Sequence, residues 1–202
     1  MDRLRVGILL FPDVEVLDFA GPFEVFSVTR LDESRRREEP SPFEPMTVAE
    51  RDQPVRATGG LRVVPDHTFD TCPPLDALVV PGGWGTRSEV ENSTLIAWIA
   101  RAASQARWVT SVCTGVFLLA RAGLVTGRKV TTHWKSLDRL RDTHPDLTVD
   151  ANARVTRDGN VWTSAGISAG IDLALLVVAD AFGEAVARAT ARHMEYPYPG
   201  ED

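Results

Sequence analysis

The sequence has 202 residues, a formal net charge of −6, and apolar and charged fractions of 44% and 25% that are ordinary for a globular protein. This length fits a single globular domain over residues 1–202 with a substantial core. An acidic chain is poorly suited to neutralise phosphates or to bind an anionic membrane, so we expect neither nucleic acid nor a membrane as a partner.

Cysteine usage and the amino terminus predict a cytoplasmic protein. The only two cysteines are Cys72 and Cys113, so no disulfide framework is expected and a reducing compartment is the simpler environment. Residues 1–5 lead directly into a strand-like segment, without the regions of a signal peptide. The most apolar stretch, Ile167–Phe182, contains two aspartates and is too short for a membrane span, so it predicts a buried helix.

The chain begins with a predicted strand, loop and helix. Leu4–Phe11 is nearly continuous in apolar residues, as a central strand covered on both faces should be, and Pro12 ends it. A helix is predicted over Phe23–Val28 with Pro22 at its first position, because proline suits the start of a helix. This assignment leaves Asp13–Asp18 in a loop.

Strands and helices continue to alternate along the rest of the chain. The polar segment Leu31–Pro45 is interpreted as solvated, because its charges cancel locally. Further strands are predicted at residues 43–49, 78–80, 108–112 and 129–132. Hairpins are predicted around Gly59-Gly60 and Asp158-Gly159-Asn160. Helices are predicted at residues 93–104, 116–122, 135–143, 167–182 and 184–195.

This alternation predicts the α/β class, with an open, mostly parallel sheet and helices on both faces. In such sheets, ligands bind beyond the carboxyl ends of the strands. Three candidate pieces follow predicted strands: Asp18, the Gly82-Gly83 loop and Cys113. We therefore expect these pieces to form the functional site.

Cys113 lies at the corner between a predicted strand and a predicted helix. A side chain at such a corner projects outward, as in a nucleophile elbow. Unpaired N–H groups and the positive end of the helix dipole lie nearby, and both favour the thiolate. The alternative is a buried cysteine that acts as a small hydrophobe. Cys72 lies in a predicted loop, and we assign it no role.

The glycine-rich loop Pro81–Gly85 follows a buried strand. Its spacing fits neither a dinucleotide-binding fingerprint nor a P-loop. We interpret it as backbone that must approach another group closely, with N–H groups free to donate. Amides near Gly83 and Thr114 are candidates to stabilise negative charge that develops on an adduct.

Asp18 is the candidate acid. It could instead be a turn or capping residue, but no glutamate or glutamine stands three residues later to complete a capping box. A buried carboxyl group beside a thiolate has a raised pKa and can donate a proton near neutral pH.

His133 follows a short predicted strand and could reach the site, although a lone histidine is more often structural. The remaining histidines, His67, His144 and His193, have no matching partner.

Five motifs in order resemble the ThiJ/PfpI superfamily. They are Leu17–Phe26 (LDFAGPFEVF), Val80–Gly83 (VPGG), Val112–Gly115 (VCTG), Thr131–Trp134 (TTHW) and Ser164–Asp172 (SAGISAGID). The resemblance covers essentially the whole chain. Within the superfamily, the combination of Asp18, Cys113 and Thr114 is similar to that of isocyanide hydratases.

The resemblance implies a flavodoxin-like α/β sandwich of the class I glutamine amidotransferase type, usually a homodimer, with no metal or organic cofactor. In hydratase-like members a thiolate adds to the terminal carbon of an isocyanide, and an acid protonates that carbon. The thioimidate is then hydrated to an N-substituted formamide. The resemblance makes Cys113 the nucleophile, Asp18 the proton donor and later the water activator, and Thr114 a neighbour of the reacting carbon. Gly82, Gly83 and His133 are candidate substrate-binding residues.

The sequence differs from three other branches of the superfamily, and these differences argue against the functions of those branches. Protease-like members have histidine after the cysteine, so Thr114 argues against a peptidase. Chaperone- and glyoxalase-like members usually carry glutamate where Asp18 stands. Regulators of the AraC type share several motifs but continue into a helix-turn-helix region, and this sequence ends at Asp202 without one.

The primary hypothesis is an enzyme, an isocyanide hydratase-like lyase that acts on a small molecule. Two alternatives stay open. One is a non-catalytic domain that senses a ligand or the redox state through oxidation of Cys113. The other is a glyoxalase or deglycase that acts on small carbonyl compounds.

Overall fold

The computed structural model describes residues 2–199. Its centre is a seven-stranded sheet in the order β10-β11-β7-β6-β1-β2-β5. Neighbouring strands are parallel except for β10 and β11, which form the predicted hairpin. The strands are β1 (Leu4–Leu9), β2 (Phe43–Ala49), β5 (His67–Thr68), β6 (Ala77–Val80), β7 (Trp108–Val112), β10 (Val155–Asp158) and β11 (Val161–Ser164). The predicted α/β class with a mostly parallel sheet is confirmed.

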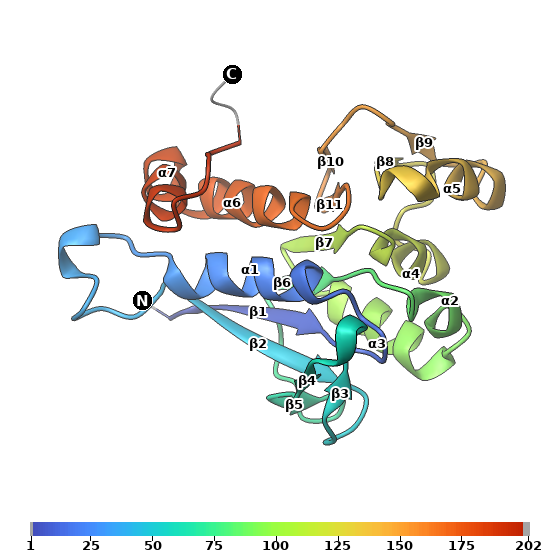
Figure 1. Ribbon diagram of the computed structural model, residues 1–202, viewed down its shortest axis with the longest axis horizontal. Coiled ribbons are helices and arrows are strands. Elements are labelled where there is room, and N and C mark those ends of the chain that lie inside the picture. The colour runs from blue at the N-terminus through green and yellow to red at the C-terminus, as the bar shows by residue number, and fades with distance from the viewer. Residues whose placement is uncertain (1, 200–202) are drawn as a thin grey trace.

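Helices cover both faces of this sheet (Figure 1). On one face lie α1 (Val16–Val28), α6 (Ala169–Phe182) and α7 (Glu184–His193). The other face is covered by α3 (Ser93–Ala103) and α4 (Gly115–Arg121), with α2 (Thr86–Glu89) and α5 (Leu137–Thr143) beside α4. None of the helices in residues 2–199 has the length and apolar character needed to cross a membrane.

Short elements lie outside the central sheet and its covering helices. Two-stranded pairs are formed by β3 (Val55–Arg56) with β4 (Arg62–Val63) and by β8 (Lys129–Val130) with β9 (Thr148–Val149). Single 3₁₀ turns occur at Glu33–Arg35, Thr58–Gly60 and Trp134–Ser136. The β3-β4 pair is the hairpin expected around Gly59-Gly60.

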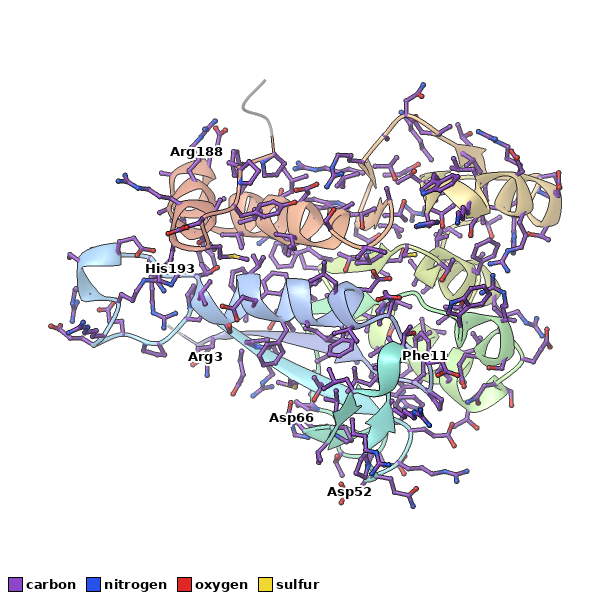
Figure 2. All side chains as sticks on the ribbon, in the orientation of Figure 1. Arg3, Phe11, Asp52, Asp66, Arg188 and His193 are labelled. Atoms are coloured by element: carbon purple, nitrogen blue, oxygen red, sulfur yellow. The ribbon has the colours of Figure 1, made fainter. Side chains whose placement is uncertain are left out.

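The core follows from the apolar runs of the central strands. All four residues of β6 are at most 2% exposed, because the strand has helices on both faces. In β1, Ile8 is fully buried and pairs with Thr47 of β2 and Val79 of β6. Figure 2 shows charged side chains such as Arg3 and Asp52 at the periphery, while Phe11 lies inside and is 2% exposed.

The first helix differs from its prediction. It begins at Val16, so Asp18 lies in its first turn instead of in a loop, and Pro22 lies inside the helix. An internal proline costs about 3 kcal/mol because it removes a hydrogen bond and crowds the preceding turn. Phe19 and Phe26 are buried in a helix that packs against the sheet and α6, and this packing outweighs the local cost.

The strand order places a topological switch point between β1 and β6. From β1 the chain passes to β2 on one side, and it later returns to β6 on the other side. Ligands of such sheets bind in the crevice outside the carboxyl ends of the strands at this point. Asp18 follows β1, Gly82 follows β6 and Cys113 follows β7, so all three belong to this edge of the sheet.

Candidate active site

Cys113 occupies a sharp turn between β7 and α4. Its φ is 57°, a region that residues other than glycine rarely adopt. The turn is held from two directions: its N–H donates to the carbonyls of Ser164 and Ala165 at 3.2 and 3.1 Å, and its carbonyl accepts from Thr132 Oγ1 at 2.7 Å. Neighbouring segments thus hold a strained backbone in place, as is common at functional sites. The predicted elbow geometry is present.

The glycine loop approaches this elbow closely. A Cβ atom on Gly82 would lie 2.5 Å from Thr114 N and 2.9 Å from Cys113 Cβ, so only glycine fits without displacement. A Cβ atom on Gly115, the first residue of α4, would collide with the carbonyl of Val80. These contacts confirm the interpretation of the loop as closely approaching backbone.

The loop amides are not free, and that part of the expectation is wrong. Gly82 N–H donates to Asp18 Oδ2 at 2.9 Å, and Gly83 N–H donates to Thr114 Oγ1 at 3.0 Å. Buried N–H groups find internal acceptors whenever these are close, and the tight approach of the loop supplies them. The amide that does face the Cys113 sulfur is that of Thr114.

Asp18 is a fully buried carboxyl group behind the cysteine. Burial raises its pKa to about 7, the hydrogen bond from Gly82 N–H lowers it, and the charge of Glu15 raises it further. Oδ1 has no partner in hydrogen-bond geometry within residues 2–199, yet the Cys113 thiol and the Ile167 N–H lie near enough to lower the pKa. The raised pKa agrees in direction with the expectation, and burial is its main cause.

The sulfur of Cys113 does not favour the thiolate in the resting protein. Burial raises the pKa of the thiol to about 12, and the charge of Asp18 raises it as well. The N–H and hydroxyl groups of Thr114 oppose this effect. The expectation of a thiolate is wrong because the side chain is only 7% exposed, and desolvation outweighs the dipole of a one- to two-turn helix. Cys113 is therefore a thiol in the resting protein.

The Thr114 side chain is fixed by a hydroxyl network. Thr114 Oγ1 accepts from Gly83 N–H and from Thr86 Oγ1, the latter at 3.1 Å. Thr86 belongs to α2 and is 1% exposed. Sequence reasoning missed this residue, because α2 spans only four residues and gives no periodic signal.

A cavity of about 240 Å³ opens onto the cysteine. Its lining residues are Glu15, Gly83, Trp84, Arg87, Cys113, Thr114, His133, Lys135, Ser136 and Ile167. Four of the six candidate residues thus share one cavity. The other two, Asp18 and Gly82, are not among the lining residues. They are hydrogen-bonded to each other, since Gly82 N–H donates to Asp18 Oδ2.

His133 forms part of the cavity wall. Its Nδ1 accepts from Lys135 N–H at 3.3 Å, and its ring lies against Gly166, where a Cβ atom would collide with it. Burial and the charge of Lys135 lower its pKa, so the imidazole is neutral at physiological pH. The ring stacks on Trp134 with centroids 5.7 Å apart. The geometry suits a shaping role.

Two apolar side chains at this cavity were not predicted. Trp84 is 66% exposed and Ile167 is 39% exposed. Ile167 has a φ of 60°, a strained value for a β-branched residue. Both lie in segments that contain sequence motifs, the glycine loop and the Ser164–Asp172 motif. A single exposed apolar residue forms no pattern, however, so its place at the cavity could not be predicted.

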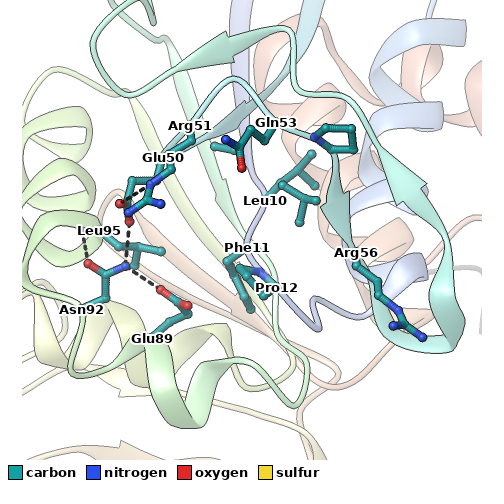
Figure 3. Close-up of a pocket in the computed structure, with 13 residues that line it drawn as sticks. Leu10, Phe11, Pro12, Glu50, Arg51, Gln53, Arg56, Glu89, Asn92 and Leu95 are labelled. Carbon is teal, nitrogen blue, oxygen red and sulfur yellow. Dashed lines mark hydrogen bonds and ion pairs between the residues drawn. The ribbon is translucent and has the colours of Figure 1, made fainter.

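A larger cavity, of about 440 Å³, lies beside the end of β1 (Figure 3). On its wall, the carboxylates of Glu50 and Glu89 both accept from Asn92 Nδ2, at 2.9 and 2.8 Å. Its lining residues include no cysteine or histidine. Within residues 2–199 no three His, Cys, Asp or Glu side chains converge as a metal site would need. The reactive groups therefore gather at the smaller cavity.

An open parallel sheet with a cysteine on a strand-to-helix corner and a buried acid behind it defines an α/β protein of the nucleophile-elbow type. The sequence model of the DJ-1/PfpI family matches residues 4–180. The chain belongs to the DJ-1/PfpI family, and the resemblance to ThiJ/PfpI proteins is confirmed.

Proteins similar in sequence to this chain include an enzyme and a transcriptional regulator. An isonitrile hydratase from Pseudomonas putida is 39% identical over 202 residues, which cover 98% of this chain and 82% of the relative. The HTH-type transcriptional regulator GbdR from Pseudomonas aeruginosa is 30% identical over 142 residues, which cover 70% of this chain and 38% of the regulator. The family therefore contains both catalytic and regulatory proteins.

Solved structures agree with the fold. A ThiJ/PfpI family protein from Pseudomonas syringae has a TM-score of 0.84 at 33% identity, covering all of this chain and 79% of the other. Drosophila melanogaster DJ-1beta has a TM-score of 0.80 at 19% identity, covering 98% of this chain and 100% of the other, and at that identity it supports the fold alone. The predicted flavodoxin-like architecture is confirmed.

Proposed function

We propose that the protein is an isocyanide hydratase-like lyase that adds water to an isocyanide and releases an N-substituted formamide. The observation that carries the proposal is the buried pair of Cys113, on a strained elbow, and Asp18, with a pKa of about 7. The similarity to an isonitrile hydratase over nearly the full chain supports this substrate class.

The first step uses the thiol proton of Cys113 in molecules whose Asp18 is a carboxylate. Asp18 accepts the thiol proton of Cys113 as sulfur attacks the terminal carbon of the isocyanide, and it then delivers the same proton to that carbon. A new S–C bond and a new C–H bond form, and the product is a thioimidate. A carboxyl group whose pKa is near neutral can both accept this proton and donate it.

The second step hydrates the thioimidate. Asp18, again a carboxylate, takes a proton from the attacking water and passes it to the nitrogen of the thioimidate, so it returns to a carboxylate. When the tetrahedral adduct collapses, the C–S bond breaks, and the hydroxyl proton of the adduct passes through Asp18 to the sulfur, which restores the thiol of Cys113. One water is consumed, and the formamide leaves with the carbonyl oxygen that this water supplied.

Neighbouring residues position these groups. Gly82 N–H holds Asp18 Oδ2, so we assign Gly82 to the support of the acid and not to substrate contact. Thr114 presents its N–H toward the sulfur and the reacting carbon, while Gly83 and His133 shape the cavity wall. The exposed ring of Trp84 and the side chain of Ile167 suit the hydrocarbon substituent of an isocyanide.

The proposal includes a cytoplasmic homodimer of single-domain subunits that needs neither a metal nor an organic cofactor. The substrate carbon already carries the lone pair that accepts a proton, so a thiol and a carboxyl group supply the acid-base and nucleophilic chemistry that the reaction requires.

The similarity to GbdR favours a second candidate, a ligand-sensing domain without turnover. Peroxide sensing is less well supported, since such sensors use accessible thiolates, whereas Cys113 is buried and its pKa is raised. A glyoxalase or deglycase shares the nucleophile and is distinguished by turnover of methylglyoxal.

Formamide formation from a simple alkyl or aryl isocyanide tests the proposal. In Asp18→Asn the amide oxygen still accepts from Gly82 N–H but takes no proton from sulfur, so the rate should fall about 10²- to 10⁴-fold. Asp13→Asn is the matched control, because Asp13 is exposed on the preceding loop and its φ of 56° suits asparagine. This control should keep the wild-type rate.

The possible results separate the three functions. No formamide from folded wild type with an intact thiol contradicts the hydratase proposal. Methylglyoxal turnover in that case identifies the glyoxalase alternative, and saturable ligand binding without turnover identifies the sensor.

A further inference from the structure

A cavity of about 310 Å³ is lined by residues on and next to α2, α4 and α5. These three helices lie on the same side of the molecule in Figure 1. The lining residues are Thr86, Arg87, Val90, Glu91, Phe117, Arg121, Arg139, Thr143 and His144. Each of the three helices contributes one arginine: Arg87 from α2, Arg121 from α4 and Arg139 from α5. The proposed hydratase reaction does not use this cavity.

Few acidic side chains among residues 2–199 neutralise these arginines. Glu91 is the only acid among the lining residues and lies 3.8 Å from Arg121 in an exposed ion pair. Within residues 2–199 no carboxylate lies within 4 Å of Arg87 or Arg139. Their guanidinium groups rest on aromatic rings instead, 4.1 Å from Trp84 and 4.0 Å from Phe117 respectively.

Arg139 is the least satisfied member of the cluster. Its Nε is buried and has no hydrogen-bond partner in the described part of the chain. Burial and the charge of Arg87 both lower its pKa, because two like charges are held near each other. A buried donor without an acceptor destabilises a fold, so an anion that supplied acceptors would relieve this cost.

We propose that this cavity binds a phosphorylated small molecule through Arg87, Arg121 and Arg139. The planar fork of a guanidinium group matches phosphate oxygens in two parallel hydrogen bonds. A phosphate monoester carries about −1.5 to −2 charge near neutral pH, which matches three arginines offset by one glutamate better than a single carboxylate does. The volume suits a small organic phosphate.

The cavity adjoins the cysteine but is not the same site. Arg87 lines both cavities, and Thr86, which lines the arginine-rich one, donates to Thr114 Oγ1. Arg121 and Arg139 line only the arginine-rich cavity. Binding to it can therefore be measured directly, whatever reaction Cys113 performs.

Isothermal titration calorimetry with phenyl phosphate, inorganic phosphate and benzoate tests the proposal at one fixed, low salt concentration. We expect phenyl phosphate to bind most tightly and benzoate most weakly. Arg139→Gln and Arg121→Gln should each weaken phenyl phosphate binding about 10- to 100-fold, because each removes charge-assisted hydrogen bonds. Arg139→Lys keeps the charge without the fork and should lie between Arg139→Gln and wild type.

Arg141→Gln is the matched control on the same helix, because Arg141 pairs with Asp138 at 2.9 Å and does not line the cavity. It should bind as wild type does. Arg121 is largely exposed, so its variant tests the site even if Arg139→Gln fails to fold by circular dichroism. The proposal is overturned by absent binding at millimolar phenyl phosphate, by tighter binding of benzoate, or by equal affinities in Arg121→Gln, Arg141→Gln and wild type.

Discussion

Replacing Asp18 with asparagine should change the pH dependence of stability in a defined direction. The pKa of Asp18 is raised from 3.8 to about 7, so the folded protein binds this proton more tightly than the unfolded chain. The stabilisation is fully present below about pH 3.8 and is lost as the pH rises to about 7. Asparagine does not titrate, so the variant escapes this loss.

The magnitude follows from the same pKa values. A pKa raised from 3.8 to about 7 in a fully buried group corresponds to about 4 kcal/mol of unfolding free energy. The new amide N–H₂ points toward the unpartnered Oδ1 position, which costs about 1–3 kcal/mol at every pH. Asp18→Asn should therefore be less stable than wild type at pH 4 and more stable at pH 8.

Urea denaturation of both proteins at pH 4 and pH 8 measures this swing of about 4 kcal/mol. Asp52→Asn is the control, because Asp52 is exposed and its replacement should give no comparable swing. A loss of stability in Asp18→Asn that is the same at both pH values would refute the raised pKa and the role of burial in it.

Three further substitutions probe the structure around the site. Gly82→Ala places a methyl group 2.5 Å from Thr114 N, so the free energy of unfolding in urea should fall by about 1–3 kcal/mol; wild-type stability would be the contrary result. Thr86→Val removes the hydroxyl that holds Thr114, and we expect about 1 kcal/mol less stability together with slower formamide formation, whereas unchanged values for both would argue against the network. Asp172→Ala removes the carboxylate that accepts from the Tyr196 hydroxyl at 2.9 Å and from Arg154 Nε at 2.6 Å, and it leaves Tyr196 only the more distant Ser168 carbonyl at 3.4 Å. The thermal midpoint should therefore fall with a loss of about 1–3 kcal/mol; an unchanged midpoint would contradict this reasoning.

Much of the fold could be predicted from local patterns. Strands Phe43–Ala49 and Trp108–Val112 have the predicted bounds, because their apolar runs are flanked by clear breaks. The helix predicted over residues 93–104 spans Ser93–Ala103, and the Asn92 side chain caps it by accepting from Leu95 N–H at 3.2 Å. Periodicity and capping chemistry are properties of neighbouring residues, so the sequence displays them directly.

Elements that depend on tertiary contacts could not be predicted in this way. The start of α1 is set by burial of Phe19 and Phe26 across an internal proline. Short elements such as α2 and β5 contain too few residues for any period to appear. Their positions follow from packing against distant segments.

The candidate site, like the fold, could be predicted from the sequence only in part. The rule that ligands bind at the carboxyl ends of parallel strands was enough to bring Asp18, Gly82 and Cys113 together. The partners of the loop amides and the raised pKa of Cys113 could not be predicted, because both depend on distances and burial that only the folded chain defines. The catalytic roles of these residues stay predictions.

The proposed covalent step at Cys113 can be tested by rapid acid quenching followed by mass spectrometry. With excess isocyanide, we expect a transient gain equal to the mass of the isocyanide on the peptide that contains Cys113. We expect neither adduct nor formamide in Cys113→Ala. Formamide formation at the wild-type rate by folded Cys113→Ala would contradict a covalent step at Cys113.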